Sequence, residues 1–234
     1  ARLRGRLAEA AGWLEQALAA CDAQTPSRLR TRALQGLALV HREAGRAEQA
    51  LPLLAESLSI ERPQGRPRIT AICLINYAAA LTDAGQLEEA AQALAETDAI
   101  TSDSVDGLRT TELELAFANI DLRRHQWDAA ASRLGRALAS AENNADHGGI
   151  AEVLCAIADL AVGRGQPQEA IAPLQRALAI WSRLDVPLEV ARILARLDRA
   201  CTAAGEVTVA GKHRRGYQKI LSELDLNEAC LRLR

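Results

Sequence analysis

The chain has 234 residues, of which 49% are hydrophobic and only 3% are aromatic, and its formal net charge is −2. This charge gives no overall attraction to nucleic acid, so we expect this segment to make no direct contact with it. The sequence has neither an apolar run long enough for a membrane helix nor a signal peptide, which predicts a cytoplasmic protein. The five cysteines are widely spaced without a CxxC pair, so neither disulfides nor a zinc site is expected.

Apolar residues recur with the helical period along the whole sequence, which predicts an all-α protein. The predicted helices span residues 6–22, 28–44, 46–60, 69–84, 86–98, 108–124, 126–141, 150–164, 166–183, 187–204 and 206–224. Residues 1–225 are expected to form one helical array, and residues 226–234 a capping segment with a short helix. The stretch TSDSVDG, residues 101–107, predicts the longest loop. Because the chain opens with ARLRG and contains no methionine, we interpret it as a piece of a longer protein.

One unit of two helices repeats every 40 residues. The position between the two helices is occupied by Gly5, Gly45, Gly85, His125, Gly165 and Gly205. Five residues later comes Ala10, Ala50, Ala90, Ala130, Ala170 or Ala210, and four residues after that Leu14, Leu54, Leu94, Leu134, Leu174 or Arg214. Glycine ends a helix readily in the left-handed conformation, and histidine tolerates it better than most residues. We expect the alanine to lie where two helices approach closely.

A helix pair cannot bury its apolar stripe alone, so this periodicity predicts a solenoid of about six stacked pairs. The unit resembles the tetratricopeptide repeat (TPR), since Leu34, Leu37-Ala38, Gly45 and Ala50-x3-Leu54 match its positions. The resemblance implies a right-handed superhelix of antiparallel pairs. The period is 40 rather than about 34 residues, from which we expect longer links between repeats. HEAT-type repeats, with a similar period, are the alternative fold.

We find no catalytic, cofactor or metal motif. Gly211-Lys212 resembles the end of a phosphate-binding loop, but His213 replaces its Ser/Thr and the spacing of the glycines is wrong. The basic cluster formed by residues 212–215 fits either a solvated helix face or a patch for an acidic partner. The four histidines lack a partner four residues away with metal-ligand character. The sequence therefore predicts a non-catalytic protein that binds no cofactor, and a catalytic site assembled from residues distant in the sequence is the alternative.

In TPR-like superhelices the first helix of each pair lines a concave groove. By position, the resemblance implies a binding surface of Arg32, Gln35, Leu39, Ile72, Ile75, Glu112, Leu115, Asn119, Glu152, Asp159, Arg192 and Arg199. This surface would be basic at both ends, apolar in the third repeat and acidic in the fourth and fifth. The Lys/Asn carboxylate clamp of chaperone-binding members is absent. The expected partner is a protein or peptide, either a helix or an extended segment, with an apolar anchor and a basic flank. An ordinary solvated surface is the alternative.

The 40-residue period and phrases such as ALPLLAESLSI (residues 50–60) are similar to the C-terminal TPR arrays of bacterial MalT-like, LuxR-type and antibiotic-regulatory transcription regulators. This resemblance implies a sensor or interaction module of a signalling regulator whose ATPase and DNA-binding domains lie elsewhere. Two other hypotheses are a stand-alone scaffold or adaptor and a peptide-sensing receptor. A small effector in the groove and homo-oligomerisation also stay open.

Overall fold

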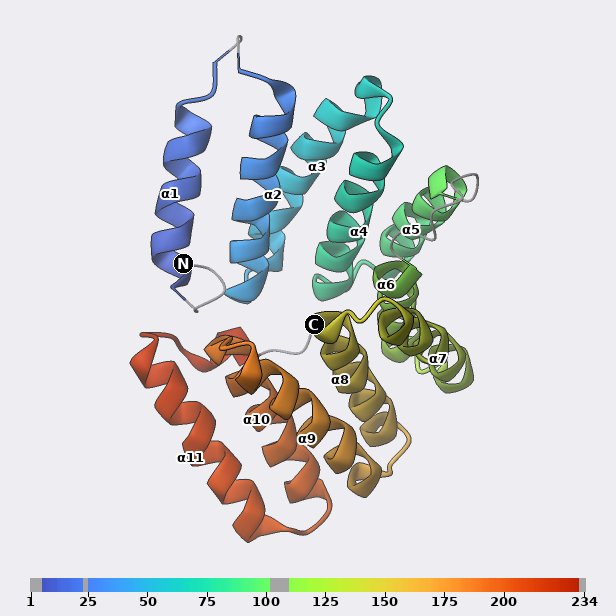
Figure 1. Cartoon of the computed structure of the whole chain (residues 1–234), viewed down its shortest axis with the longest axis vertical. Coiled ribbons are helices and arrows are strands. Elements are labelled where there is room, and N and C mark those ends of the chain that lie inside the picture. The colour runs from blue at the N-terminus through green and yellow to red at the C-terminus, as the bar shows by residue number, and fades with distance from the viewer. Residues whose placement is uncertain (1–5, 23–24, 102–109, 232–234) are drawn as a thin grey trace. The chain divides into compact units, whose positions relative to one another are not determined.

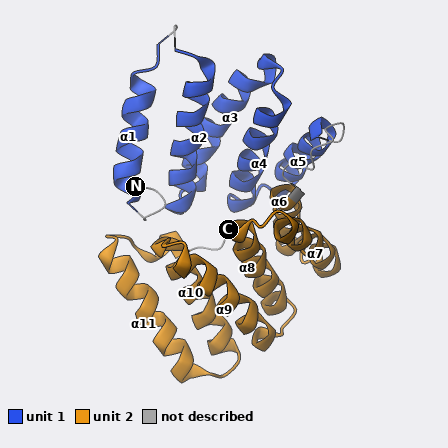
Figure 2. Cartoon of the chain, viewed as in Figure 1, with its two compact units in different colours: residues 1–2, 6–108, 234 blue, residues 3–5, 109–233 orange. Residues whose placement is uncertain are grey.

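The computed structural model describes residues 6–22, 25–101 and 110–231, and this part of the chain is helical with no β-strand (Figure 1). Two compact units divide the chain, residues 6–108 (unit 1) and 109–233 (unit 2) (Figure 2). Unit 1 contains α1 (Leu7–Ala19), α2 (Ser27–Glu43), α3 (Ala47–Glu61), the short 3₁₀ helix η2 (Arg62–Gln64), α4 (Pro67–Asp83) and α5 (Leu87–Thr101). Unit 2 contains α6 (Thr110–Arg123), α7 (Trp127–Asn143), α8 (His147–Gly163), α9 (Pro167–Arg183), α10 (Pro187–Ala203), α11 (Val207–Glu223) and the 3₁₀ helix η3 (Glu228–Leu231).

The turns between helices repeat every 20 residues rather than every 40. Left-handed φ angles between 50° and 83° occur at Gly45, Gly65, Gly85, His125, Ala145, Gly165, Asp185, Gly205 and Asp225. The turn after α2 shows the hydrogen bonds of a Schellman motif, in which the Gly45 and Arg46 amides donate to the carbonyls of Arg42 and His41. The left-handed conformation expected of His125 is confirmed, with φ 57°.

The prediction of longer links between repeats holds between α3 and α4, where residues 62–66 include η2, but it is wrong in unit 2. In unit 2 the links that join one repeat to the next, residues 144–146 and 184–186, are as short as residues 164–166 inside a repeat. The extra length of the 40-residue period lies in the helices, most of which have 17 residues. The predicted link at residues 184–186 has these bounds, whereas the predicted link before α8, residues 142–149, is too long. No glycine marks either turn, since Ala145 and Asp185 adopt the left-handed conformation there.

Several helix ends also differ from the prediction. Helix α4 begins at Pro67, because proline is well tolerated in a first helical turn. Helix α8 begins at His147 rather than residue 150, and the Asp146 carboxylate caps it by accepting from the Gly149 amide at 3.0 Å. Helix α5 continues to Thr101, and the rest of the predicted 101–107 loop lies outside the described residues.

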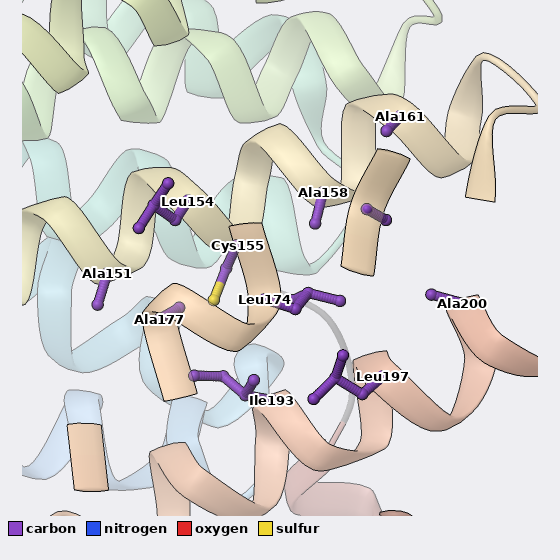
Figure 3. Packing of buried hydrophobic residues seen from close by; sticks show 11 residues of the cluster. Ala151, Leu154, Cys155, Ala158, Ala161, Leu174, Ala177, Ile193, Leu197 and Ala200 are labelled. Atoms are coloured by element: carbon purple, nitrogen blue, oxygen red, sulfur yellow. The ribbon is translucent and has the colours of Figure 1, made fainter. Parts of the chain in front are cut away.

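The core consists of leucines and alanines at repeated positions. The alanine five residues after each turn is buried in all six repeats, as predicted, from Ala10 to Ala210. In unit 2, α8, α9 and α10 share one cluster, in which Leu174 and Leu197 lie between the alanines of neighbouring helices (Figure 3). Each fully buried leucine contributes about 1.5–3 kcal/mol relative to an exposed one. Small residues beside each leucine therefore allow the helices to pack closely.

Candidate binding surface

The first helices of successive repeats lie on the inner side of each unit. We call α2, α4, α6, α8 and α10 the first helices and α1, α3, α5, α7, α9 and α11 the second helices, after their order within a repeat. Helix α2 contacts α4 in unit 1 and α6 contacts α8 in unit 2, and no comparable contact joins successive second helices in the described ranges. Side chains on the inner surface of the first helices are therefore candidates to contact a partner.

In unit 1 the inner surface is apolar with basic residues beside it. Leu39 on α2 and Ile72 on α4 are partly exposed, and Arg32 is exposed. Two other predicted residues, Gln35 and Ile75, are buried and pack within the unit. The side chains that unit 1 can offer to a partner are thus fewer than the sequence indicated.

A chain of hydrogen bonds fixes a polar side chain at this surface that the sequence analysis did not single out. The Asn76 amide donates from Nδ2 to Gln35 Oε1 at 2.6 Å, and Gln35 Nε2 donates to Ser57 Oγ at 2.6 Å. Ser57 Oγ in turn donates to the Leu54 carbonyl at 2.9 Å. Asn76 is itself partly buried, so its amide is held in one orientation by buried groups on α2 and α3. The signal in the sequence was a set of polar residues at core positions of the second repeat.

Beside this chain lies a buried carboxylate. The Glu61 side chain is fully buried, accepts from Thr31 Oγ1 at 2.7 Å and pairs with Arg66 at 2.7 Å. Cys73 lies in the same region, and burial raises the pKa of its thiol. The network joins α2, α3 and α4 and orders the part of unit 1 that carries Asn76.

In unit 2 the inner surface is acidic. Glu112 on α6 and Glu152 on α8 occupy equivalent positions and are both exposed, while Asn119 is partly exposed. Leu115, at the position of Gln35, is buried and packs between α6 and α7. Because α6 and α8 are in contact, the two carboxylates belong to one continuous surface.

Arginines on α10 complete the inner surface of unit 2. Arg196 Nε donates to Asp159 Oδ2 on α8 at 3.3 Å, and Arg199 is exposed one turn further along. Partial desolvation of its guanidinium, followed by the charge of Arg196, lowers the pKa of Arg199. Arg192 is only 3% exposed, because it donates to the Cys230 carbonyl at 2.9 Å and to the Glu189 carboxylate. Arg192 is therefore bound by the C-terminal segment and does not lie on the open part of this surface.

All five cysteines are free thiols, and burial raises the pKa of Cys155 to about 12, which keeps it protonated and unreactive. The described residues contain no group of three or more His, Cys, Asp or Glu side chains placed to hold a metal ion. Among them, no helix has both the length and the hydrophobicity needed to cross a membrane.

Comparison with known families agrees with this geometry. A family model of the tetratricopeptide repeat matches residues 109–183. This match covers α6 to α9, so these helices form tetratricopeptide repeats. No curated protein matches the sequence of this chain.

Solved structures of other proteins share the TPR-like fold. BtubC (BKLC) from P. vanneervenii is 18% identical with a TM-score of 0.62, over 96% of this chain and 93% of that one. A Rap protein complexed with competence and sporulation factor is 16% identical with a TM-score of 0.75, over 95% of this chain and 61% of that one. Bacillus thuringiensis PlcR, in complex with the peptide PapR7 and DNA, is 12% identical with a TM-score of 0.73, over 87% and 73%. At these identities the likeness concerns the fold.

Proposed function

We propose that this TPR array is a non-catalytic module that binds a protein or peptide on its first helices, and that it serves as the sensor part of a bacterial transcription or signalling regulator. The observation that carries the binding proposal is the composition of the inner surface. Unit 1 offers partly exposed Leu39 and Ile72, and unit 2 offers the exposed carboxylates of Glu112 and Glu152.

The two units favour different features of a ligand, an apolar anchor on unit 1 and a basic segment on unit 2. An apolar side chain gains by leaving water against Leu39 and Ile72, and a basic residue is attracted by the carboxylates of unit 2. Asn76 is suited to hydrogen bonding with a ligand backbone, since its neighbours already fix its orientation. Two similar structures support the proposal by precedent, because the Rap protein holds competence and sporulation factor and PlcR holds a peptide and DNA.

Binding can be tested by fluorescence anisotropy with labelled peptides that place one leucine or phenylalanine beside either arginines or glutamates. We expect saturable binding of the arginine-flanked peptides. Glu112→Lys and Glu152→Lys together should weaken that binding by at least about tenfold, which corresponds to about 1.4 kcal/mol. Glu142→Lys, at an exposed position on the second helix α7, is the matched control and should leave the affinity unchanged. Equal losses for the control and the double variant would contradict the proposed surface.

The regulator context needs a separate measurement, namely the size of the native protein in its source cells by immunoblot against this array. A band several times larger than the 25.1 kDa of this chain would support a sensor module within a multidomain regulator. A band close to 25.1 kDa would contradict that context and favour a stand-alone adaptor.

A further inference from the structure

The second helices carry opposite charges in the two units. In unit 1, α1, α3 and α5 contain two, three and four acidic residues respectively, and no lysine or arginine. Glu61 is buried, and Glu56 and Glu96 pair with arginines outside these helices, so the largest group of exposed acidic residues lies on α5. In unit 2 the balance reverses along the chain, and α11 contains four basic residues and one acidic residue. The same sequence thus presents an acidic outer surface on one unit and a basic one on the other.

The basic charges of α11 form a stripe. Lys212, Arg215 and Lys219 are spaced by three and four residues, which places them on one side of the helix, and all three are exposed. The fourth basic residue, Arg214, is bound to Asp198. Glu223 lies 3.8 Å from Lys219, but both side chains are more than half exposed, so this pair is weak. Val207, at the beginning of the helix, is an apolar side chain that is 71% exposed.

Helix dipoles do not explain this distribution. Acidic residues in a first turn and basic residues in a last turn stabilise a helix, and this accounts for Glu88 and Glu89 in α5. It does not account for Asp98 near the C-terminal end of α5, where a carboxylate is unfavourable. It also leaves Lys212 and Arg215 unexplained, since they lie in the middle of α11. A polar outer face on the last full helix would need no single sign of charge.

We propose that the basic stripe of α11 binds the acidic second-helix surface of unit 1 in a second copy of this chain. Charge complementarity carries the choice of partner, because the chain supplies both surfaces. The two surfaces differ, so the contact is heterologous, and one such contact leaves the first copy with an unused acidic surface and the second copy with an unused basic surface. Association should therefore extend head to tail with rising concentration. Because the groups are exposed, salt should weaken it, since the Debye length is about 8 Å at 0.15 M ionic strength.

Sedimentation velocity at low and high salt tests this contact. The wild-type chain should associate at low salt and dissociate at high salt. Lys212→Glu, Arg215→Glu and Lys219→Glu, combined in one α11 variant, should weaken association by at least about tenfold. The matched control combines Arg28→Glu, Arg46→Glu and Arg68→Glu, which change the net charge equally at exposed positions outside the second helices and should not weaken it. Circular dichroism confirms that each variant is folded.

Mixing two variants identifies the surfaces that meet. An α5 variant with Glu88→Lys, Glu89→Lys and Asp98→Lys should also fail to associate with itself. Mixed in equal amounts with the α11 variant, it should restore association, because one partner then offers only acidic surfaces and the other only basic ones. A wild-type chain that is monomeric at low salt, association insensitive to salt, or a mixture that stays monomeric would each overturn the proposal. Equal weakening by the matched control would do the same.

Discussion

Arg214 on α11 donates from Nε and Nη2 to the two carboxylate oxygens of Asp198 on α10, at 2.9 and 3.0 Å. The corresponding positions in the four preceding repeats hold a buried alanine and a buried leucine: Ala38 with Leu54, Ala78 with Leu94, Ala118 with Leu134 and Ala158 with Leu174. The last repeat therefore replaces an apolar contact by an ion pair. The Asp198 side chain is 7% exposed, whereas that of Arg214 is 53% exposed.

This asymmetry predicts that Arg214→Leu destabilises the protein more than Asp198→Ala. Removing the arginine leaves a nearly buried carboxylate without its partner, at a cost of about 1–3 kcal/mol. Removing the aspartate leaves an arginine that water can still solvate. The double variant Asp198→Ala/Arg214→Leu restores the pair of the other repeats and should recover most of the loss. Urea unfolding of the four proteins measures this, and equal stability of the two single variants would contradict it.

The hydrogen-bonded chain in unit 1 predicts a similar non-additive effect. Ser57→Ala should cost about 1–3 kcal/mol in unfolding free energy, because the buried Gln35 amide loses its acceptor. The fourth repeat holds Leu115 and Ala137 at the positions of Gln35 and Ser57. Gln35→Leu/Ser57→Ala should therefore be more stable than Ser57→Ala alone. Thermal unfolding of both variants checks this, and strictly additive losses would show that the chain does not act as a unit.

The fold was largely predictable from the sequence, whereas the candidate surface was predictable only in part. The helices and their stacking follow from the 40-residue register, because every repeat buries the same apolar positions against its neighbours. That register cannot show which inner positions are covered. Gln35 is buried because Ser57 and Asn76 bond to it from two other helices. Arg192 is buried because the segment after α11, which forms the short 3₁₀ helix η3 where earlier repeats form a long first helix, provides the Cys230 carbonyl.

Close approach of the helices predicts a strong difference between adjacent alanines of α7. Ala130 is fully buried in the cluster that contains Leu134, so Ala130→Leu should overpack this core and cost about 1–3 kcal/mol in unfolding free energy. The structure shows Ala131 partly buried against the same cluster, so Ala129, which is exposed, is the better control. Ala129→Leu should leave the midpoint of urea unfolding almost unchanged, and a matching loss would refute the close-packing assignment.

His41 predicts a loss of stability in mild acid. Its Nδ1 atom is buried and has no hydrogen-bond partner in the described part of the chain. Burial, followed by the charge of Arg46, lowers the pKa of His41 below its usual value of about 6.5. Between the lowered pKa and about 6.5 the unfolded state binds more protons than the folded state, so stability rises with pH across this window and falls on acidification.

Replacing His41 with glutamine should reduce this pH dependence. Burial also lowers the pKa of His213, so part of the slope should persist in the His41→Gln variant. His147→Gln, at an exposed position, is the matched control and should retain the wild-type slope. The measurement is the urea midpoint of the three proteins between pH 5 and 8. A His41→Gln variant as sensitive to acid as the wild-type protein would show that the buried imidazole does not titrate with unfolding.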